Sequence, residues 1–360
     1  MKKILLSLLL AFITAIAFAQ ICPITVTFTS SDESTGIITF DYEFTGFEDR
    51  THKITTVEVN FDDDEGYQQI PGEYLSGDYP DVGGSGPTFS GTIEWDGAAS
   101  FPDRYQDQTK IRVKAEQHYI SGDGVTDIDG NEYRTVIIGN QEWMAENLRV
   151  TRYNNEDNIP LIMDDAHWSN TTGGAYTIYD HNAWNTDGID SPKDMVAIYG
   201  KLYNWYAATD ARGFCPEGWS LPSNDDWVQL VDFVVNQGYP NEINNPNGAG
   251  NALKSCRQVN SPLDGCQTSE HPRYNQQSWH YGFDEFGFTA IPAGRRWPYG
   301  LFHLIGGYSN YWTSTEHSTV SAISHNIINS SGSVIQQNTL GKRSGFSVRC
   351  FRGLVPPEEE

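Results

Sequence analysis

Helical periodicity is scarce in this chain of 360 residues, and that scarcity predicts a fold built mainly from short strands, turns and loops. The clearest helix signal runs from Asp225 to Val235, where four apolar side chains share one face. Ser223 precedes it as a capping residue, and Asp226 three residues later gives an acidic variant of the capping box. A second, shorter helix is predicted from Gly248 to Ser255.

The first third of the chain alternates apolar and polar side chains with a period of two. Turn-forming stretches rich in Gly, Asp and Ser separate the alternating runs. The runs are Ile24–Phe28, Ile37–Phe44, Thr55–Phe61 and Ile111–Ala115. Short alternating strands at this spacing predict an all-β, immunoglobulin-like sandwich over residues 20–120.

The composition changes at Ser121-Gly122-Asp123-Gly124, which we predict to be a linker covering residues 121–125. All ten tryptophans except Trp95 follow it, among many Tyr, Asn and Gly residues. A chain of this length is also too long for one ordinary core. We therefore expect a second domain over residues 126–353 and a disordered tail at 354–360.

Residues 1–19 have the pattern of a secretory signal peptide. A short basic start is followed by an apolar run that ends at Ala17-Phe18-Ala19, with small residues where a signal peptidase reads. We predict cleavage near Ala19 and a secreted or extracytoplasmic location, in the periplasm or at the cell surface. Lipidation of Cys22 ranks second, because Gln20-Ile21 stands where a lipobox needs small residues. No later stretch is apolar enough to predict a transmembrane segment.

The charge of the chain is strongly negative, with 23 basic against 47 acidic residues and a net charge of −24. Such a chain should repel nucleic acid, and we expect no nucleic-acid partner. A solvated acidic surface explains most of this charge. The run Asp62–Glu65 could ligate calcium, but no EF-hand spacing surrounds it, and a solvated turn is the preferred interpretation. We name no other cofactor.

The five cysteines of an exported chain predict disulfide bonds. Cys256 and Cys266 flank a sequence that can turn, and we expect them to bridge and close a local loop. Cys215 and Cys350 would join the centre of the second domain to its last strand. Cys22 would then be free or paired with another chain. The absence of a C-x-x-C pair argues against a zinc ribbon or a thioredoxin-type site.

Catalytic motifs give no positive signal. The chain contains neither Gly-x-Ser-x-Gly nor His-Glu-x-x-His, and its nine histidines show no paired spacing for zinc. A glycosidase needs two carboxylates at a fixed separation, and 47 acidic residues do not allow the sequence to select a pair. We therefore name no catalytic residue and no metal ligand.

Aromatic residues gather between positions 279 and 312. Most of them should fill the core of a domain that has few helices. Trp297, Tyr299 and Tyr308 stand among Gly, Pro and Arg in predicted loops, and we choose these three as the binding residues. Exposed rings of this kind stack on sugar faces or anchor protein interfaces.

Seven ordered phrases in the second domain carry a resemblance to a known family. They are Thr126–Tyr133, Val136–Leu148, Tyr199–Ala207, Cys215–Pro222, Gly287–Gly294, Tyr311–Glu316 and Ser347–Cys350. Over roughly residues 125–353 the chain resembles the Fibrobacter succinogenes major paralogous domain family, found in many exported proteins of Bacteroidetes and Fibrobacter. The resemblance implies an exported module and brings no established biochemical activity with it.

A fainter resemblance concerns the fold. Gly218–Pro222 followed by Asp226-Trp227 is similar to the "RLPTEAEW" phrase of the formylglycine-generating sulfatase-modifying family, and Gly345–Arg349 to its terminal phrase. This implies a C-type-lectin-like domain, α+β and rich in loops. Formylglycine formation needs two neighbouring reactive cysteines near the carboxy-terminal end of the domain, and Cys350 is the only cysteine there. The tripeptides with which calcium-dependent lectins bind calcium and sugar do not occur in this chain either.

The sequence thus predicts two domains, a β-sandwich followed by a lectin-like domain. We expect an exported, non-catalytic binding or structural module that presents an aromatic loop surface to a cell-surface glycan or protein. The alternative is an extracytoplasmic enzyme, a hydrolase or a modifying enzyme, on the same C-type-lectin-like fold.

Overall fold

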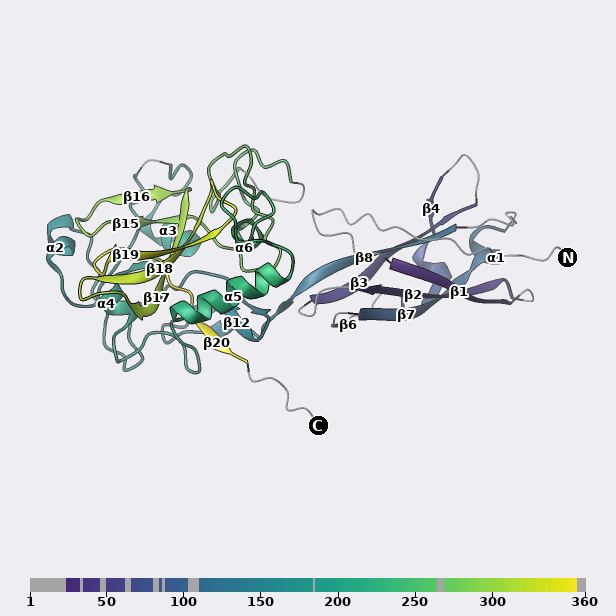
Figure 1. Cartoon of the computed structure of the whole chain (residues 1–360), viewed down its shortest axis with the longest axis horizontal. Coiled ribbons are helices and arrows are strands. Elements are labelled where there is room, and N and C mark those ends of the chain that lie inside the picture. Colours follow the sequence, from purple (N-terminus) through teal and green to yellow (C-terminus); the bar gives the residue numbers. More distant parts are fainter. Residues whose placement is uncertain are drawn as a thin grey trace. The chain divides into compact units, whose positions relative to one another are not determined.

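A computed structural model describes residues 24–32, 35–45, 50–61, 66–79, 84–85, 88–102, 110–183, 185–263 and 269–354 (Figure 1). The protein is rich in β-strands, which form several sheets, and has few helices. The chain divides into two compact units, residues 1–120 and 121–360. The predicted signal peptide, Cys22 and the acidic run Asp62–Glu65 lie outside the described residues.

The first unit contains two groups of paired strands, which include the four predicted runs except for Phe61, one residue beyond the end of its strand. One is an antiparallel sheet in the order β1 (Ile24–Asp32), β2 (Ile37–Thr45), β7 (Thr88–Asp96), β5 (Leu75–Gly77). In the other, β3 (Arg50–Asn60) pairs with β8 (Lys110–Ser121), β4 (Gln68–Gln69) and β6 (Gly84–Ser85). The described part of the unit also contains two single turns of helix, η1 (Gly72–Tyr74) and α1 (Gly97–Ser100).

One hydrophobic core joins these two groups of strands. Phe40 of β2 and Trp95 of β7 are buried in the same cluster as Ile54 and Val57 of β3 and Val113 of β8. Every second side chain of a strand points to the same face of the sheet. The apolar side chains of the period-two pattern therefore lie on one face of each strand and form this shared core. The prediction of a β-rich first segment is confirmed.

The second unit mixes short strands with short helices. Its strands are β9 (Val125–Thr126), β10 (Glu132–Tyr133), β11 (Thr135–Ile138), β12 (Gln141–Met144), β13 (Tyr176–Thr177), β14 (Leu202–Tyr203), β15 (Ala293–Arg296), β16 (Phe302–Ile305), β17 (Tyr308–Glu316), β18 (Ser321–Ile328), β19 (Val334–Gly341) and β20 (Phe351–Gly353). Its helices are α2 (Asp165–Asn170), α3 (Pro192–Tyr199), α4 (Trp205–Ala208), α5 (Asn224–Asn236) and α6 (Ala249–Leu253).

The largest sheet of this unit has five strands in the order β16-β15-β17-β18-β19 (Figure 1). Its neighbours are antiparallel except for β15 and β17, which pair in parallel. Strand β16 is therefore an edge strand. A smaller antiparallel group, β11-β12-β20, brings the end of the domain back to its beginning, and Arg352 on β20 forms an ion pair with the buried Glu142 on β12.

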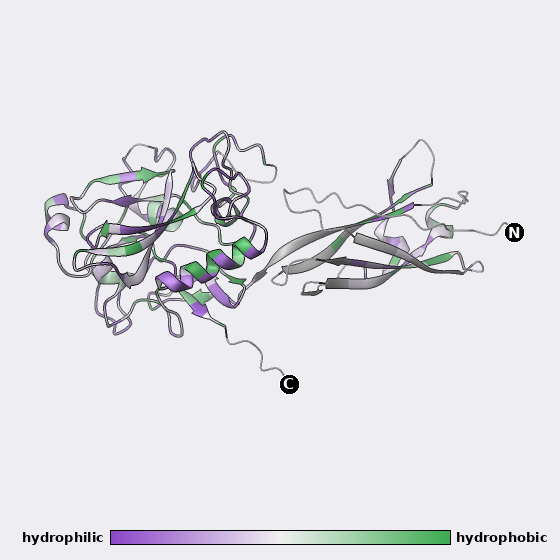
Figure 2. Ribbon diagram, in the orientation of Figure 1, coloured by the Kyte–Doolittle hydropathy of each residue, from purple (hydrophilic) through white to green (hydrophobic). Residues whose placement is uncertain are grey.

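Helix α5 confirms the strongest helix prediction. The Ser223 hydroxyl accepts a hydrogen bond from the Asp226 N–H, and the Asp226 carboxylate accepts one from the Ser223 N–H, which completes the capping box. Figure 2 shows the helix with alternating apolar and polar stripes. The four expected apolar side chains, Trp227, Leu230, Val231 and Val234, are buried.

The second predicted helix is shorter than expected. Helix α6 ends at Leu253, because Lys254 adopts an extended backbone and bridges to Ala290. Tertiary pairing therefore overrides the local helix signal over the last two residues of the predicted range. Among the described residues, no helix is long and apolar enough to cross a membrane.

Many aromatic residues of the second unit form its core, but the expectation that most of those between positions 279 and 312 do so is wrong. Phe286, Phe288, Tyr311 and Trp312 are buried there, and the others are half-buried or exposed. Trp227 packs edge-on against Trp143 and Phe288 and stacks on Tyr311, with ring centroids 5.1 to 5.7 Å apart. Trp312 is fully buried against Phe346. Such edge-to-face and stacked pairs add to the free energy gained by burial alone.

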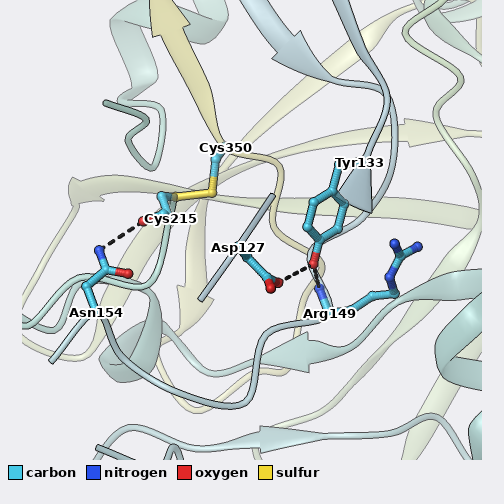
Figure 3. The surroundings of a disulfide bond; sticks show 6 residues. All are labelled: Asp127, Tyr133, Arg149, Asn154, Cys215 and Cys350. Atoms are coloured by element: carbon cyan, nitrogen blue, oxygen red, sulfur yellow. Dashed lines mark hydrogen bonds between the residues drawn. A yellow bond between two sulfur atoms is a disulfide. The ribbon is translucent and has the colours of Figure 1, made fainter. Parts of the chain in front are cut away.

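A disulfide bond joins Cys215 to Cys350, as predicted (Figure 3). Asn154 supports it by donating a hydrogen bond of 2.9 Å from its side-chain amide to the Cys215 carbonyl. The second predicted bridge, Cys256–Cys266, stays a prediction, because Cys266 lies outside the described residues.

The opening phrase of the second unit is a hydrogen-bonded turn. The Asp127 carboxylate accepts hydrogen bonds from the backbone N–H groups of Asp129 and Asn131 and, at 2.6 Å, from the Tyr133 hydroxyl. That hydroxyl in turn accepts a bond from the Arg149 N–H (Figure 3). The Asp127 carboxylate thus has a structural role, which the sequence pattern did not indicate.

Candidate functional site

The turn between β15 and β16 is set by its own four residues, Trp297-Pro298-Tyr299-Gly300. The Gly300 N–H donates to the Trp297 carbonyl, and the Trp297 N–H donates to the Leu301 carbonyl, both at 2.9 Å. Pro298 suits the second position of such a turn, and Gly300 adopts a φ of 106° that other residues rarely reach. Tyr299 therefore stands at the tip, and it is 58% exposed.

Arg296 fixes this hairpin to the rest of the unit. Its guanidinium is fully buried and lies at the start of the turn. It donates hydrogen bonds of 2.6 to 3.0 Å to the carbonyls of Gly300, Ile162 and Met163, to the Thr177 hydroxyl and to the Asp165 carboxylate. These five bonds match the five N–H donors of a guanidinium, so the position of the tip is well defined.

Arg295 occupies the opposite face of β15, because successive side chains on a strand alternate. Its guanidinium carbon lies 3.9 Å from the ring centroid of Trp297 and 5.3 Å from that of Tyr308. Only 8% of the residue is exposed, and its Nε has no hydrogen-bond partner. Burial lowers the pKa of Arg295, and the neighbouring groups that raise it are Tyr308 and Tyr299 rather than a carboxylate.

Trp297 lies in the middle of a stack. Its ring is nearly parallel to that of Tyr299, at 13° and 6.0 Å between centroids. It also stacks against His303, at 30° and 6.5 Å, and His303 faces Arg295 across the two strands. We call these five residues, Arg295, Trp297, Tyr299, His303 and Tyr308, the hairpin platform.

The structure thus brings the three predicted binding residues together around one arginine. Tyr299 and His303 are exposed, whereas Trp297 and Tyr308 are half-buried. The expectation that all three stand in loops is wrong for Tyr308, which is the first residue of β17. Tyr308 pairs with Ile328 of β18, and the next residue, Ser309, pairs in parallel with Gly294 of β15; a single-sequence pattern does not reveal such pairings.

Arg295 and His303 were missed by the sequence interpretation. A signal for Arg295 was present, because the doublet Arg295-Arg296 directly precedes Trp297. In a strand the two arginines must point to opposite faces, and only one of them can anchor the turn. A loop has no such alternation of side chains, so the prediction of a loop here gave no reason to separate the roles of the two arginines.

Two other charged groups of the second unit, Arg349 and Asp284, have hydrogen-bond partners. Arg349 donates to the carbonyls of Phe288 and Thr289 and to the side chain of Asn147. Asp284 accepts from the N–H and hydroxyl of Thr289, and burial raises its pKa to about 6. Among the residues that the structure describes, no cluster of three His, Cys, Asp or Glu side chains could hold a metal ion.

The second unit matches the model of a known protein family. The model of the Fibrobacter succinogenes major domain matches residues 136–352, more than half of the chain. No curated protein and no solved structure gives a significant match. The matched range includes the Cys215–Cys350 disulfide and the whole hairpin platform. With its seven phrases in order and this match, the chain belongs to the Fibrobacter succinogenes major domain family.

Proposed function

We propose that this chain is an exported, non-catalytic binding protein whose second unit holds a cell-surface glycan on the hairpin platform. The observation that carries the proposal is the exposed ring of Tyr299, held in line with Trp297 at the tip of an anchored hairpin. An aromatic ring that is already ordered loses little conformational entropy when it binds, and this favours affinity.

A glycan suits this surface better than a protein partner. A stable protein interface covers about 800 Å² on each side, with several buried anchors. The exposed part of the platform consists of few side chains, chiefly Tyr299, His303 and the neighbouring Leu301. One aromatic face matches the C–H face of one pyranose ring, and the adjacent polar groups can form hydrogen bonds with sugar hydroxyls.

The proposal also includes the cellular location of the protein and the folds of its two units. The signal-peptide pattern and the Cys215–Cys350 bridge both suit an oxidising, extracytoplasmic location. In this proposal the first unit is an immunoglobulin-like sandwich that acts as a spacer or adhesion module. The second unit is a C-type-lectin-like domain, a class of scaffold in which loops and hairpins can vary while the core is kept.

The test is the substitution Tyr299→Ala, measured on a glycan array and then by calorimetric titration with the glycans bound. Truncating this ring should weaken binding by about 1–3 kcal/mol and leave the thermal melt unchanged, because the side chain is largely exposed. Trp279→Ala is the matched control, since Trp279 is 74% exposed and outside the platform. It should bind as the parent does.

The outcomes separate the alternatives. If the parent and the Tyr299→Ala variant bind every glycan alike, the platform is not the binding surface. Capture of a defined surface protein, lost in the same variant, would replace the glycan by a protein partner. Turnover of a glycoside or peptide that a single Asp or Glu substitution abolishes would support the enzyme alternative.

A further inference from the structure

Three arginines are almost wholly buried in the second unit, and one of them differs from the other two. The guanidinium groups of Arg296 and Arg349 donate hydrogen bonds to backbone carbonyls and neighbouring side chains. Arg295 is 8% exposed, and its Nε is buried without a hydrogen-bond partner. Arg296 and Arg349 thus show what a structural arginine looks like in this unit, and Arg295 does not fit that pattern.

The surroundings of Arg295 compensate its charge only in part. Cation–π contacts with Trp297 and Tyr308 attract the guanidinium but provide no acceptor for its N–H groups. A buried cation whose Nε–H donor is unsatisfied costs free energy, which a bound anion would recover. The two rings also hold the guanidinium in a fixed orientation, and a fixed fork favours bidentate binding of an oxyanion.

From this contrast we infer that the hairpin platform selects an anionic saccharide, whose carboxylate or sulfate group pairs with Arg295. The inference rests on the proposed function, since the sugar ring would stack on Tyr299. Tyr299, Trp297 and Arg295 form a continuous series of contacts, so one ligand could reach both the exposed ring and the cation. His303, opposite Arg295 on β16, is a further donor beside the anion.

The negative charge of the whole chain does not oppose this selection. The net charge of −24 acts at long range, where salt screens it beyond about 8 Å at physiological ionic strength. Close to the platform, Asp165 is already paired with Arg296. Binding of the anion therefore depends on the local guanidinium rather than on the overall field.

The experiment uses the full chain and pairs of oligosaccharides that differ only in charge. Oligogalacturonate is compared with its methyl ester, and a sulfated oligogalactoside with its unsulfated form. The parent should bind at least one anionic member about tenfold or more tightly than its neutral counterpart, the usual effect of a charge-assisted hydrogen bond. The two pairs together identify whether the carboxylate or the sulfate is the preferred group.

Substitution of the arginine should remove the preference and keep the weaker binding. Arg295→Gln is expected to bind charged and neutral members alike, whereas Tyr299→Ala should weaken the binding of both members. Arg134→Gln is the matched control, because Arg134 is an exposed arginine between β10 and β11 that pairs with Glu146, outside the hairpin platform. Arg295→Lys keeps the charge and loses the fork, so it should retain part of the preference.

Each result has a defined meaning. Equal binding of both members by the parent overturns the inference and leaves the glycan-binding proposal intact. Preference for the anion that persists in the folded Arg295→Gln variant assigns the selection to another cation and also overturns it. If Arg295→Gln fails to fold, the Arg295→Lys variant decides, since an unchanged full preference would contradict the role of the fork. A parent that binds no saccharide contradicts the proposed function itself.

Discussion

Lys254 shows how a single residue can carry a charge into the core of the second unit. The residue has no exposed surface, and its ammonium group donates to the Asn251 side-chain oxygen at 2.7 Å and to the Ser331 carbonyl at 3.4 Å. No carboxylate contributes to its pKa, and burial lowers that pKa from 10.5 to about 7. The folded protein therefore disfavours the protonated form of Lys254.

This shift predicts a defined dependence of stability on pH. Between pH 7 and about 10.5 the unfolded chain binds a proton at Lys254 that the folded chain does not, so stability rises with pH across this window. Below pH 7 both states bind the proton and the penalty is constant. Relative to Lys254→Met, the parent should gain up to roughly 4 kcal/mol between pH 7 and 10.

Urea unfolding of both proteins across this range checks the prediction, because other titrating groups cancel in the difference. His280 has a pKa that is lowered below its usual value by burial and then by Lys254, so it titrates below the window. A difference in unfolding free energy that stays flat with pH would show that Lys254 is solvated in the folded protein.

At the scale of elements, the β15–β16 hairpin is specified locally and positioned by distant segments. Gly300 has a positive φ, and an added Cβ would lie 2.5 Å from the Cβ of Asp165 on α2. The residues of the turn suit the hairpin, but nothing near it in the sequence predicts α2 as its neighbour. The hairpin and α2 lie more than a hundred residues apart along the chain.

We therefore expect Gly300→Ala to impair both the fold and the platform. Backbone strain and the clash with Asp165 should cost about 2–3 kcal/mol of stability and displace Tyr299, weakening glycan binding further. The control is Gly173→Ala, where an added Cβ meets nothing within 4 Å. Thermal melts and titration with the best glycan measure both effects. A Gly300→Ala variant as stable as the control would show that the hairpin adapts freely.

At the scale of the whole molecule, the predicted linker belongs partly to the second unit. The Gly122 N–H donates to the Thr135 carbonyl, and the Gly124 N–H donates to the Thr135 hydroxyl, both at 3.0 Å. A Cβ on Gly122 would lie 2.0 Å from the buried carboxylate of Glu142. Residues 121–124 are thus part of the folded structure around β11 and β12.

Two fragments test whether the second unit folds alone and where it begins. Residues 121–354 and 125–354 should both unfold cooperatively, but the shorter one lacks the two bonds to Thr135 and should be about 1–2 kcal/mol less stable. Urea unfolding of both under oxidising conditions gives the difference. Equal stabilities would make residues 121–124 a true linker, and the absence of a cooperative transition in both would indicate one fused core.

The sequence by itself determined the features that depend on neighbours along the chain. Period-two alternation predicted the strands of the first unit, and the Ser223–Asp226 capping box predicted α5. Ordered phrases identified the family, and the pairing of Cys215 with Cys350 was predicted between two of those phrases. Each of these signals is local or carried by a motif, so it can be read without knowing what packs against it.

Only the tertiary structure decided which side chains are buried and by what. Tyr299 and Trp297 are two residues apart in one turn, yet only Tyr299 is largely exposed, because Arg295 covers the ring of Trp297. Arg295 and Arg296 are identical neighbours, and only Arg296 meets the carbonyls of residues 162 and 163. Burial and hydrogen bonding depend on segments that folding brings together from far along the chain, and for this reason the arrangement of the candidate site, with Arg295 and His303 in it, emerged only from the fold.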